Sequence, residues 1–91
     1  MSRVGTRPYR VEFSRSADRQ FRALPEDVRR RIAPRITALA NAPRPRGVEK
    51  LKGADDLYRL RVGDYRIVYE IRARVLLILV LRVAHRREVY R

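Results

Sequence analysis

A two-residue turn signal, Gly63-Asp64, separates two segments in which apolar and polar residues alternate, Leu57–Val62 and Tyr65–Ile71. Alternation with a period of two is typical of β-strands, and a glycine-containing pair between two such segments predicts a hairpin with a two-residue loop. The residues that flank such a loop face each other, so Val62 is expected to pair with Tyr65. This one pair sets the register of the whole hairpin.

The predicted register sorts the hairpin side chains onto two faces of a sheet. One face is apolar and is expected to pack under helices; it carries Tyr58, Leu60, Val62, Tyr65, Ile67 and Tyr69. The other face carries Arg59, Arg61 and Arg66, with Glu70 as the one acid. Like charges directly opposite each other destabilise a sheet. We therefore expect this face to meet acids supplied by the fold or an anionic partner; a simple solvated surface is the alternative.

The segments before the hairpin predict a strand and a helical hairpin. Tyr9–Phe13 alternates and is expected to be a half-buried strand. Ser14 or Ser16 is suited to cap a first helix, whose apolar positions are Ala17, Phe21 and Leu24. Pro25 suits the start of a second helix, and Pro34 is expected to bend that helix. The second helix has its apolar stripe at Val28, Ile32, Ile36 and Leu39.

The segments around the hairpin complete the expected fold. A basic loop, Arg44–Gly53, precedes it, and a nearly continuous apolar run, Val75–Ala84, follows it. Such a run is typical of a central strand covered on both faces. The tail, His85–Arg91, is polar and basic. The order predicts a single domain over residues 1–91: an α+β sandwich with a strand, two helices and three antiparallel strands, and with the helices on one sheet face.

The charge balance indicates a polyanionic partner. The net charge is +13, from 23 Lys and Arg against 10 Asp and Glu, and only Lys50 and Lys52 are lysines. Arginine binds phosphate oxygens in a bidentate fashion and stacks on bases, which lysine does poorly. The longest apolar run, Val75–Leu81, is too short to cross a bilayer. We expect no membrane association, and the absence of cysteine is consistent with a cytoplasmic protein.

Three segments resemble the RelE/ParE superfamily of toxins. They are Lys50-Leu51-Lys52-Gly53, the stretch Tyr58 to Tyr69, and Val83-Ala84-His85-Arg86 with Val89-Tyr90. The likeness extends from Tyr9 to Tyr90 and includes the order of the elements. It implies a RelE-like sandwich fold and an acidic, RelB-like antitoxin in a higher-order complex. RelE-type members cut mRNA on the ribosome without a metal, which implies mRNA, the ribosome and its rRNA as further partners.

The resemblance implies roles for individual residues. Arg66 matches the family arginine that contacts the scissile phosphate, Arg86 matches one that stabilises the transition state, and Tyr90 matches a tyrosine near the attacking ribose. Arg61 and Arg59 fall where RelE enzymes often carry lysines. Arginine stays protonated at any working pH, so it stabilises charge but is a poor acid or base. Arg61 is thus expected at the catalytic centre, and Arg59, with Lys50 and Lys52, in RNA and ribosome binding.

Metal-free RNA cleavage also needs groups that move protons. The ribose 2′-OH attacks the adjacent phosphate, which requires a base, an acid for the leaving 5′-oxygen and positive charge for the phosphorane. His85 is the one histidine, and its ordinary pKa of about 6.5 suits proton transfer near neutrality. Tyr90 needs cationic neighbours to act as a base. No cofactor motif or metal-ligand cluster is visible in the sequence.

Two other functions fit the same pattern. A ParE-like inhibitor of DNA gyrase shares the fold, although the set of Arg66, Arg86 and Tyr90 favours the RelE type. A non-catalytic RNA- or ribosome-binding module is also open, because the expected proton-transfer positions are the ones that depart from the family.

Overall fold

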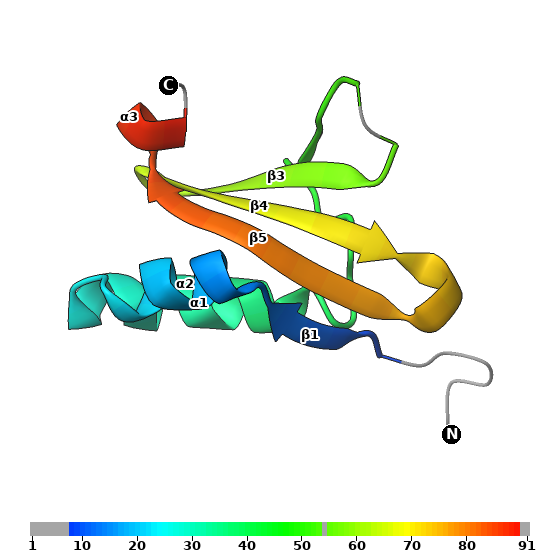
Figure 1. The fold of residues 1–91 in the computed structure, drawn as a ribbon, viewed down its shortest axis with the longest axis horizontal. Coiled ribbons are helices and arrows are strands. Elements are labelled where there is room, and N and C mark those ends of the chain that lie inside the picture. Colours follow the sequence, from blue (N-terminus) through cyan, green and yellow to red (C-terminus); the bar gives the residue numbers. More distant parts are fainter. Residues whose placement is uncertain (1–7, 54, 90–91) are drawn as a thin grey trace.

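Five strands form one sheet in the order β1-β5-β4-β3-β2, and two helices cover one of its faces (Figure 1). The computed structural model describes residues 8–53 and 55–89. The elements are β1 (Arg10–Phe13), α1 (Arg15–Arg22), α2 (Glu26–Ala38), β2 (Glu49–Lys50), β3 (Leu57–Val62), β4 (Tyr65–Arg72), the 3₁₀ turn η1 (Ala73–Val75), β5 (Leu77–His85) and α3 (Arg86–Val89). No helix among these residues is long and apolar enough to cross a membrane.

The predicted α+β sandwich is confirmed, with both long helices on one face. The sheet is mixed, however, and not purely antiparallel, because β1 pairs in parallel with β5, placing Val11 opposite Ile78. The expected loop Arg44–Gly53 contains the short edge strand β2, which pairs with β3. The tail also contains a further helix, α3, on the side of the sheet away from α1 and α2 (Figure 1).

Local capping explains where the two long helices begin. The Ser14 side chain accepts a hydrogen bond from the Ala17 backbone N–H at 3.1 Å, which satisfies one of the free donors of the first turn of α1. Pro25 directly precedes α2, where a proline costs no hydrogen bond. The helix continues through Pro34 to Ala38.

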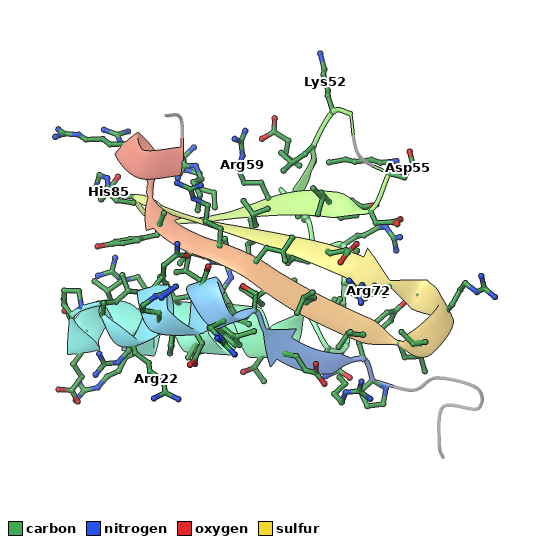
Figure 2. All side chains as sticks on the ribbon, in the orientation of Figure 1. Arg22, Lys52, Asp55, Arg59, Arg72 and His85 are labelled. Atoms are coloured by element: carbon green, nitrogen blue, oxygen red, sulfur yellow. The ribbon has the colours of Figure 1, made fainter. Side chains whose placement is uncertain are left out.

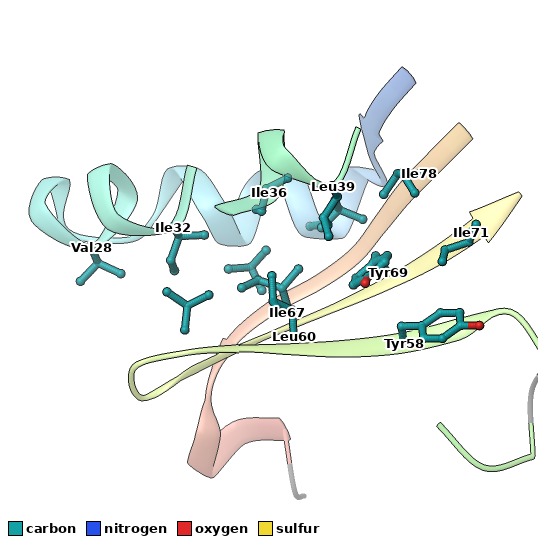
Figure 3. Packing of buried hydrophobic residues seen from close by; sticks show 14 residues of the cluster. Val28, Ile32, Ile36, Leu39, Tyr58, Leu60, Ile67, Tyr69, Ile71 and Ile78 are labelled. Atoms are coloured by element: carbon teal, nitrogen blue, oxygen red, sulfur yellow. The ribbon is translucent and has the colours of Figure 1, made fainter. Parts of the chain in front are cut away.

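The hairpin register is as predicted. Val62 pairs with Tyr65 and Arg61 with Arg66, and Gly63 adopts a positive φ of 58° in the turn. Glycine reaches that conformation without steric cost. The apolar face of the hairpin packs against Val28, Ile32, Ile36 and Leu39 of the second helix and its end (Figure 3). The core therefore lies between α2 and the centre of the sheet.

A tyrosine in this core is tied to the loop after α2. Tyr69 is fully buried and donates a hydrogen bond to the Pro43 carbonyl at 2.7 Å. Tyr58 stacks on Tyr69, and its hydroxyl accepts a hydrogen bond from Arg44 Nε at 3.0 Å. Burial raises the pKa of Tyr69 to about 12, and this hydrogen bond raises the pKa of Arg44. The loop is thus fastened to the centre of the sheet.

The apolar run Val75–Ala84 differs from the expected strand in its start, its regularity and its coverage. Val75 lies in η1 and is 59% exposed, so β5 begins at Leu77, after Leu76 has turned the chain in a left-handed conformation. A bulge then interrupts the pairing with β4, because Val68 faces Arg82 while Tyr69 faces Val80. The helices cover one side of β5 only; on the other side Arg82 is exposed.

Candidate functional site

Three arginines share the outer face of the sheet, which we define as the face turned away from α1 and α2. Arg61 of β3 lies directly opposite Arg66 of β4, and Arg59 lies opposite Val68. The sheet alternation places all three on this face, as the sequence predicts, with Arg59 pointing away from the helices (Figure 2). The crowded basic face derived from the hairpin register is therefore present.

The acid that relieves part of this crowding is Glu49, not Glu70. Glu49 lies on β2 opposite Arg59 and accepts a hydrogen bond from its guanidinium at 2.6 Å. Glu70 instead pairs with Arg72 at 2.9 Å. The expectation for Glu70 was wrong because a same-strand neighbour two residues away lies on the same face and reaches it first.

Arg66 is the one charged residue that is buried among the described residues, with 8% of its surface exposed. Its Nη1 donates hydrogen bonds to the Gly63 and Tyr65 carbonyls, at 3.4 and 3.2 Å. Neither Arg66 nor Arg61 pairs with a carboxylate in the described part of the chain. A partly desolvated guanidinium without a counter-ion is suited to an incoming anion such as a phosphate.

The start of α3 brings Arg86 to the same end of the sheet. The Arg86 backbone N–H donates to the Asp64 carbonyl at 2.7 Å, which ties α3 to the turn of the β3–β4 hairpin. The Arg86 side chain is exposed. Arg66 and Arg86, which the resemblance assigns to one centre, are thus held by the same turn.

Arg31 of α2 also reaches this turn. A Cβ at Gly63 would come within 3.3 Å of its Nη1 atom. The position of Arg31 beside this turn is not predictable from the sequence. It lies just before the buried Ile32 in a run of three arginines, and nothing in that local pattern marks it as a neighbour of a strand turn far along the chain.

His85 does not share the face of the arginines. It is the last residue of β5 and pairs with Tyr65, with the two rings edge to face at 5.4 Å. Tyr65 is on the helix-facing side and the adjacent Arg66 is on the outer side, so His85 and Arg66 point to opposite sides of the sheet. The His85 Nδ1 accepts a hydrogen bond from the Arg87 backbone N–H at 3.3 Å. The catalytic role expected for His85 stays a prediction.

The remaining predicted residues lie elsewhere. Lys50 is exposed on the edge strand β2, and Lys52 is exposed in the turn that follows, pointing away from the sheet (Figure 2). They do not join Arg66 and Arg86. Tyr90 lies outside the described residues, so its predicted role stays a prediction.

Two hollows flank the ends of β4. The larger, about 780 Å³, lies at its C-terminal end between side chains of both signs, among them Arg44, Asp56, Glu70 and Arg72. The smaller, about 320 Å³, lies at the other end beside His85 and Tyr65. Arg61, Arg66 and Arg86, which we call the arginine cluster, lie at this N-terminal end of β4. No group of three potential metal ligands occurs in residues 8–53 and 55–89.

This fold recurs in proteins of known family. A family model described as the ParE toxin of type II toxin–antitoxin systems matches residues 11–90. The chain belongs to the RelE/ParE toxin superfamily. Toxin RelE3 of Methanocaldococcus jannaschii is 31% identical to this toxin over 85 residues, which is 89% of this chain and 94% of RelE3.

Solved structures similar to this toxin include RelE toxins. The archaeal RelE–RelB complex from Pyrococcus horikoshii contains a chain with a TM-score of 0.77 and 33% identity, covering 87% of this chain and 96% of that one. The isolated Escherichia coli RelE toxin has a TM-score of 0.77 and 28% identity, with 90% of each chain covered. The protein is therefore a RelE-family toxin of a type II toxin–antitoxin system.

Proposed function

We propose that this toxin is a metal-independent endoribonuclease that cleaves mRNA on the ribosome and so inhibits translation. The observation that carries the proposal is the buried, carboxylate-free guanidinium of Arg66, with Arg61 across the strand and Arg86 at the same turn. Preorganised charge of this kind stabilises a phosphorane more than the ground-state phosphate, because negative charge accumulates during the attack.

The proposed reaction is transesterification at one phosphodiester. The ribose 2′-oxygen loses its proton and bonds to the adjacent phosphorus, and the bond to the 5′-oxygen breaks as that oxygen gains a proton. The products are a 2′,3′-cyclic phosphate and a 5′-hydroxyl end. Arg66 and Arg86 bind and stabilise the phosphate in this scheme, Arg61 adds charge, and Arg59 holds RNA together with Lys50 and Lys52.

His85 and Tyr90 are the proposed proton carriers. The position of His85 on the helix-facing side favours Tyr90, since a general base must come within hydrogen-bond reach of its proton. His85→Gln and Tyr90→Phe separate the two, because each variant keeps roughly the size of the side chain but removes the group that would transfer the proton. If neither variant slows cleavage, this mechanism is wrong.

The proposed partners are mRNA, the ribosome with its rRNA, and an acidic RelB-like antitoxin in a higher-order hetero-oligomer. A chain with net charge +13 attracts each of these polyanions electrostatically. Structures similar to this toxin include complexes described as RelE–RelB from Pyrococcus horikoshii and Escherichia coli. Action on translation implies a cytoplasmic site of action.

A translation extract tests the proposal. The toxin is added to an extract that translates a defined mRNA, and mRNA ends are mapped with and without ribosomes. Discrete cuts within codons that appear only during translation are the expected result. Uncut mRNA in a translating extract that contains folded toxin would overturn the proposal.

A second candidate is a ParE-like inhibitor of DNA gyrase, because the matching family model is the ParE one. Supercoiling by purified gyrase in the presence of the toxin discriminates the two. Inhibition of gyrase with intact mRNA favours the second candidate. If the toxin slows translation while both mRNA and gyrase remain unaffected, it acts as a non-catalytic ribosome-binding module.

A further inference from the structure

The smaller hollow lies between α1 and the ends of β4 and β5, on the helix-facing side of the sheet. Its volume is about 320 Å³, and its lining includes Gln20, Ala23, Leu24, Tyr65, Val83 and His85. Tyr65 directly precedes Arg66, and His85 directly precedes Arg86. The hollow and the arginine cluster thus lie on opposite faces of the sheet, at the same end.

The walls of the hollow suit a flat aromatic ligand. Tyr65 and His85 meet edge to face at an interplanar angle of 80°, and Leu24 and Val83 add aliphatic surface to the lining. Aromatic side chains of this kind are the surfaces on which unstacked nucleobases settle in RNA-binding proteins.

Two polar side chains of the hollow, Gln20 and Tyr65, can donate hydrogen bonds to a ligand. The Val83 backbone N–H donates to Gln20 Oε1 at 2.8 Å. Because a backbone N–H requires an acceptor, this bond fixes the orientation of the amide and leaves the Gln20 NH₂ group as a donor. The Tyr65 hydroxyl has no hydrogen bond to another described residue. Two donors favour a base whose edge presents two acceptors, such as guanine with O6 and N7 or uracil with its two carbonyl oxygens, over adenine, whose N7 acceptor lies beside the N6 amino donor.

A cationic route connects the two sides of the sheet end. Arg31 lies at the Gly63 turn on the helix side, and Arg66 donates to the Gly63 carbonyl from the outer side. Arg86 is tied to Asp64 of the same turn. A phosphodiester backbone held by these guanidinium groups passes around the turn, which brings a neighbouring base to the mouth of the hollow.

We propose that this hollow is a nucleobase pocket that selects guanine or uracil beside the phosphate cleaved by this toxin. The inference rests on the proposed ribonuclease function, which it deepens by assigning base selection to Gln20 and Tyr65. Gln20→Glu is the decisive variant, because a carboxylate still accepts from the Val83 N–H but presents no donor to the base. Ser16→Glu, an exposed position on α1, adds the same charge away from the hollow and is the matched control.

Base frequencies flanking the mapped cuts are compared for the wild type, Gln20→Glu, Tyr65→Phe and Ser16→Glu. The expected result is a roughly three- to tenfold fall in the preference for guanine or uracil in the first two variants, as for the loss of one hydrogen bond, and no change in Ser16→Glu. Unchanged base frequencies in Gln20→Glu and Tyr65→Phe, while cutting persists, would overturn the pocket and leave the proposed function standing.

A direct titration keeps the inference testable if the wild type cuts no RNA. The purified toxin is titrated with guanosine and adenosine 3′-monophosphates, and the ring protons of Tyr65 and His85 are followed by NMR. Larger shifts with the guanosine nucleotide, lost in Gln20→Glu and kept in Ser16→Glu, support the pocket. Equal or absent shifts overturn it, whatever the outcome of the cleavage assay.

Discussion

Replacing Arg66 by alanine separates the catalytic charge from the stability of the hairpin. The side chain makes two long hydrogen bonds to the Gly63 and Tyr65 carbonyls, at 3.4 and 3.2 Å. Each contributes about 0.5–1 kcal/mol to the free energy of unfolding. Removing the charge also relieves the repulsion with Arg61 directly opposite, by about 0.2–1 kcal/mol. Arg66→Ala should therefore lower the free energy of unfolding by less than about 2 kcal/mol.

The effect of Arg66→Ala on cleavage should be much larger. Loss of one preorganised contact to the transition state costs about 2.7–4 kcal/mol, which is roughly a hundred- to a thousandfold in rate. The assay is single-turnover cleavage of mRNA on programmed ribosomes, with urea unfolding of the same preparation. Arg15→Ala is the control, because it removes the same charge from an exposed position on α1, away from the outer face of the sheet. It should leave the cleavage rate and the stability nearly unchanged.

Two results would refute this reasoning. A rate within threefold of the wild type shows that Arg66 is not at the reacting phosphate. A loss of stability above about 3 kcal/mol shows that its hydrogen bonds are structural, and the kinetic comparison then loses its meaning. Arg66→Lys adds a further check, since it keeps the charge but not the planar fork and should recover only part of the rate.

Three other predictions concern the hydrogen bonds and charges described above. Tyr69 has a pKa of about 12 in the folded state against about 10 in the unfolded state. The free energy of unfolding should therefore fall as pH rises from 10 to 12, by up to about 2.7 kcal/mol. Urea unfolding at several pH values measures this decline, which the Tyr69→Phe variant should lack. Ser14→Ala should lower the free energy of unfolding by about 1 kcal/mol through loss of the α1 cap, whereas an unchanged denaturation midpoint would contradict the cap's role. Arg59→Ala should reduce the salt dependence of RNA binding by about one counterion, and an unchanged slope would mean that Arg59 serves only its ion pair with Glu49.

The parts of this fold that the sequence predicts are the local ones. The pairing of Val62 with Tyr65 follows from a two-residue turn, and the face of Arg59, Arg61 and Arg66 follows from that pair by alternation. The pairing of β1 with β5 joins residues far apart in the chain, and alternation in Tyr9–Phe13 specifies a strand without specifying its neighbour or direction. The sheet was therefore expected to be antiparallel when it is mixed.

The sheet face of His85 could not be predicted for a related reason. Its face depends on the register between β4 and β5, which contains a bulge between Val68 and Tyr69. The run Val75–Ala84 is apolar at nearly every position, so a change of phase along it leaves no trace in the sequence. Short elements such as β2, which supplies Glu49 to Arg59, likewise fall below what periodicity can detect.

The parallel pairing of β1 with β5 has a consequence for how this toxin is synthesised. β5 is the last strand made, and it bridges β1 on one side and β4 on the other. Until it leaves the ribosome, β1 has no strand to pair with and α1 lacks the strand against which it packs, and such distant contacts form slowly. A chain truncated before β5 therefore keeps the β3–β4 hairpin with Arg59, Arg61 and Arg66, but it lacks Arg86 and the strand that joins this hairpin to β1.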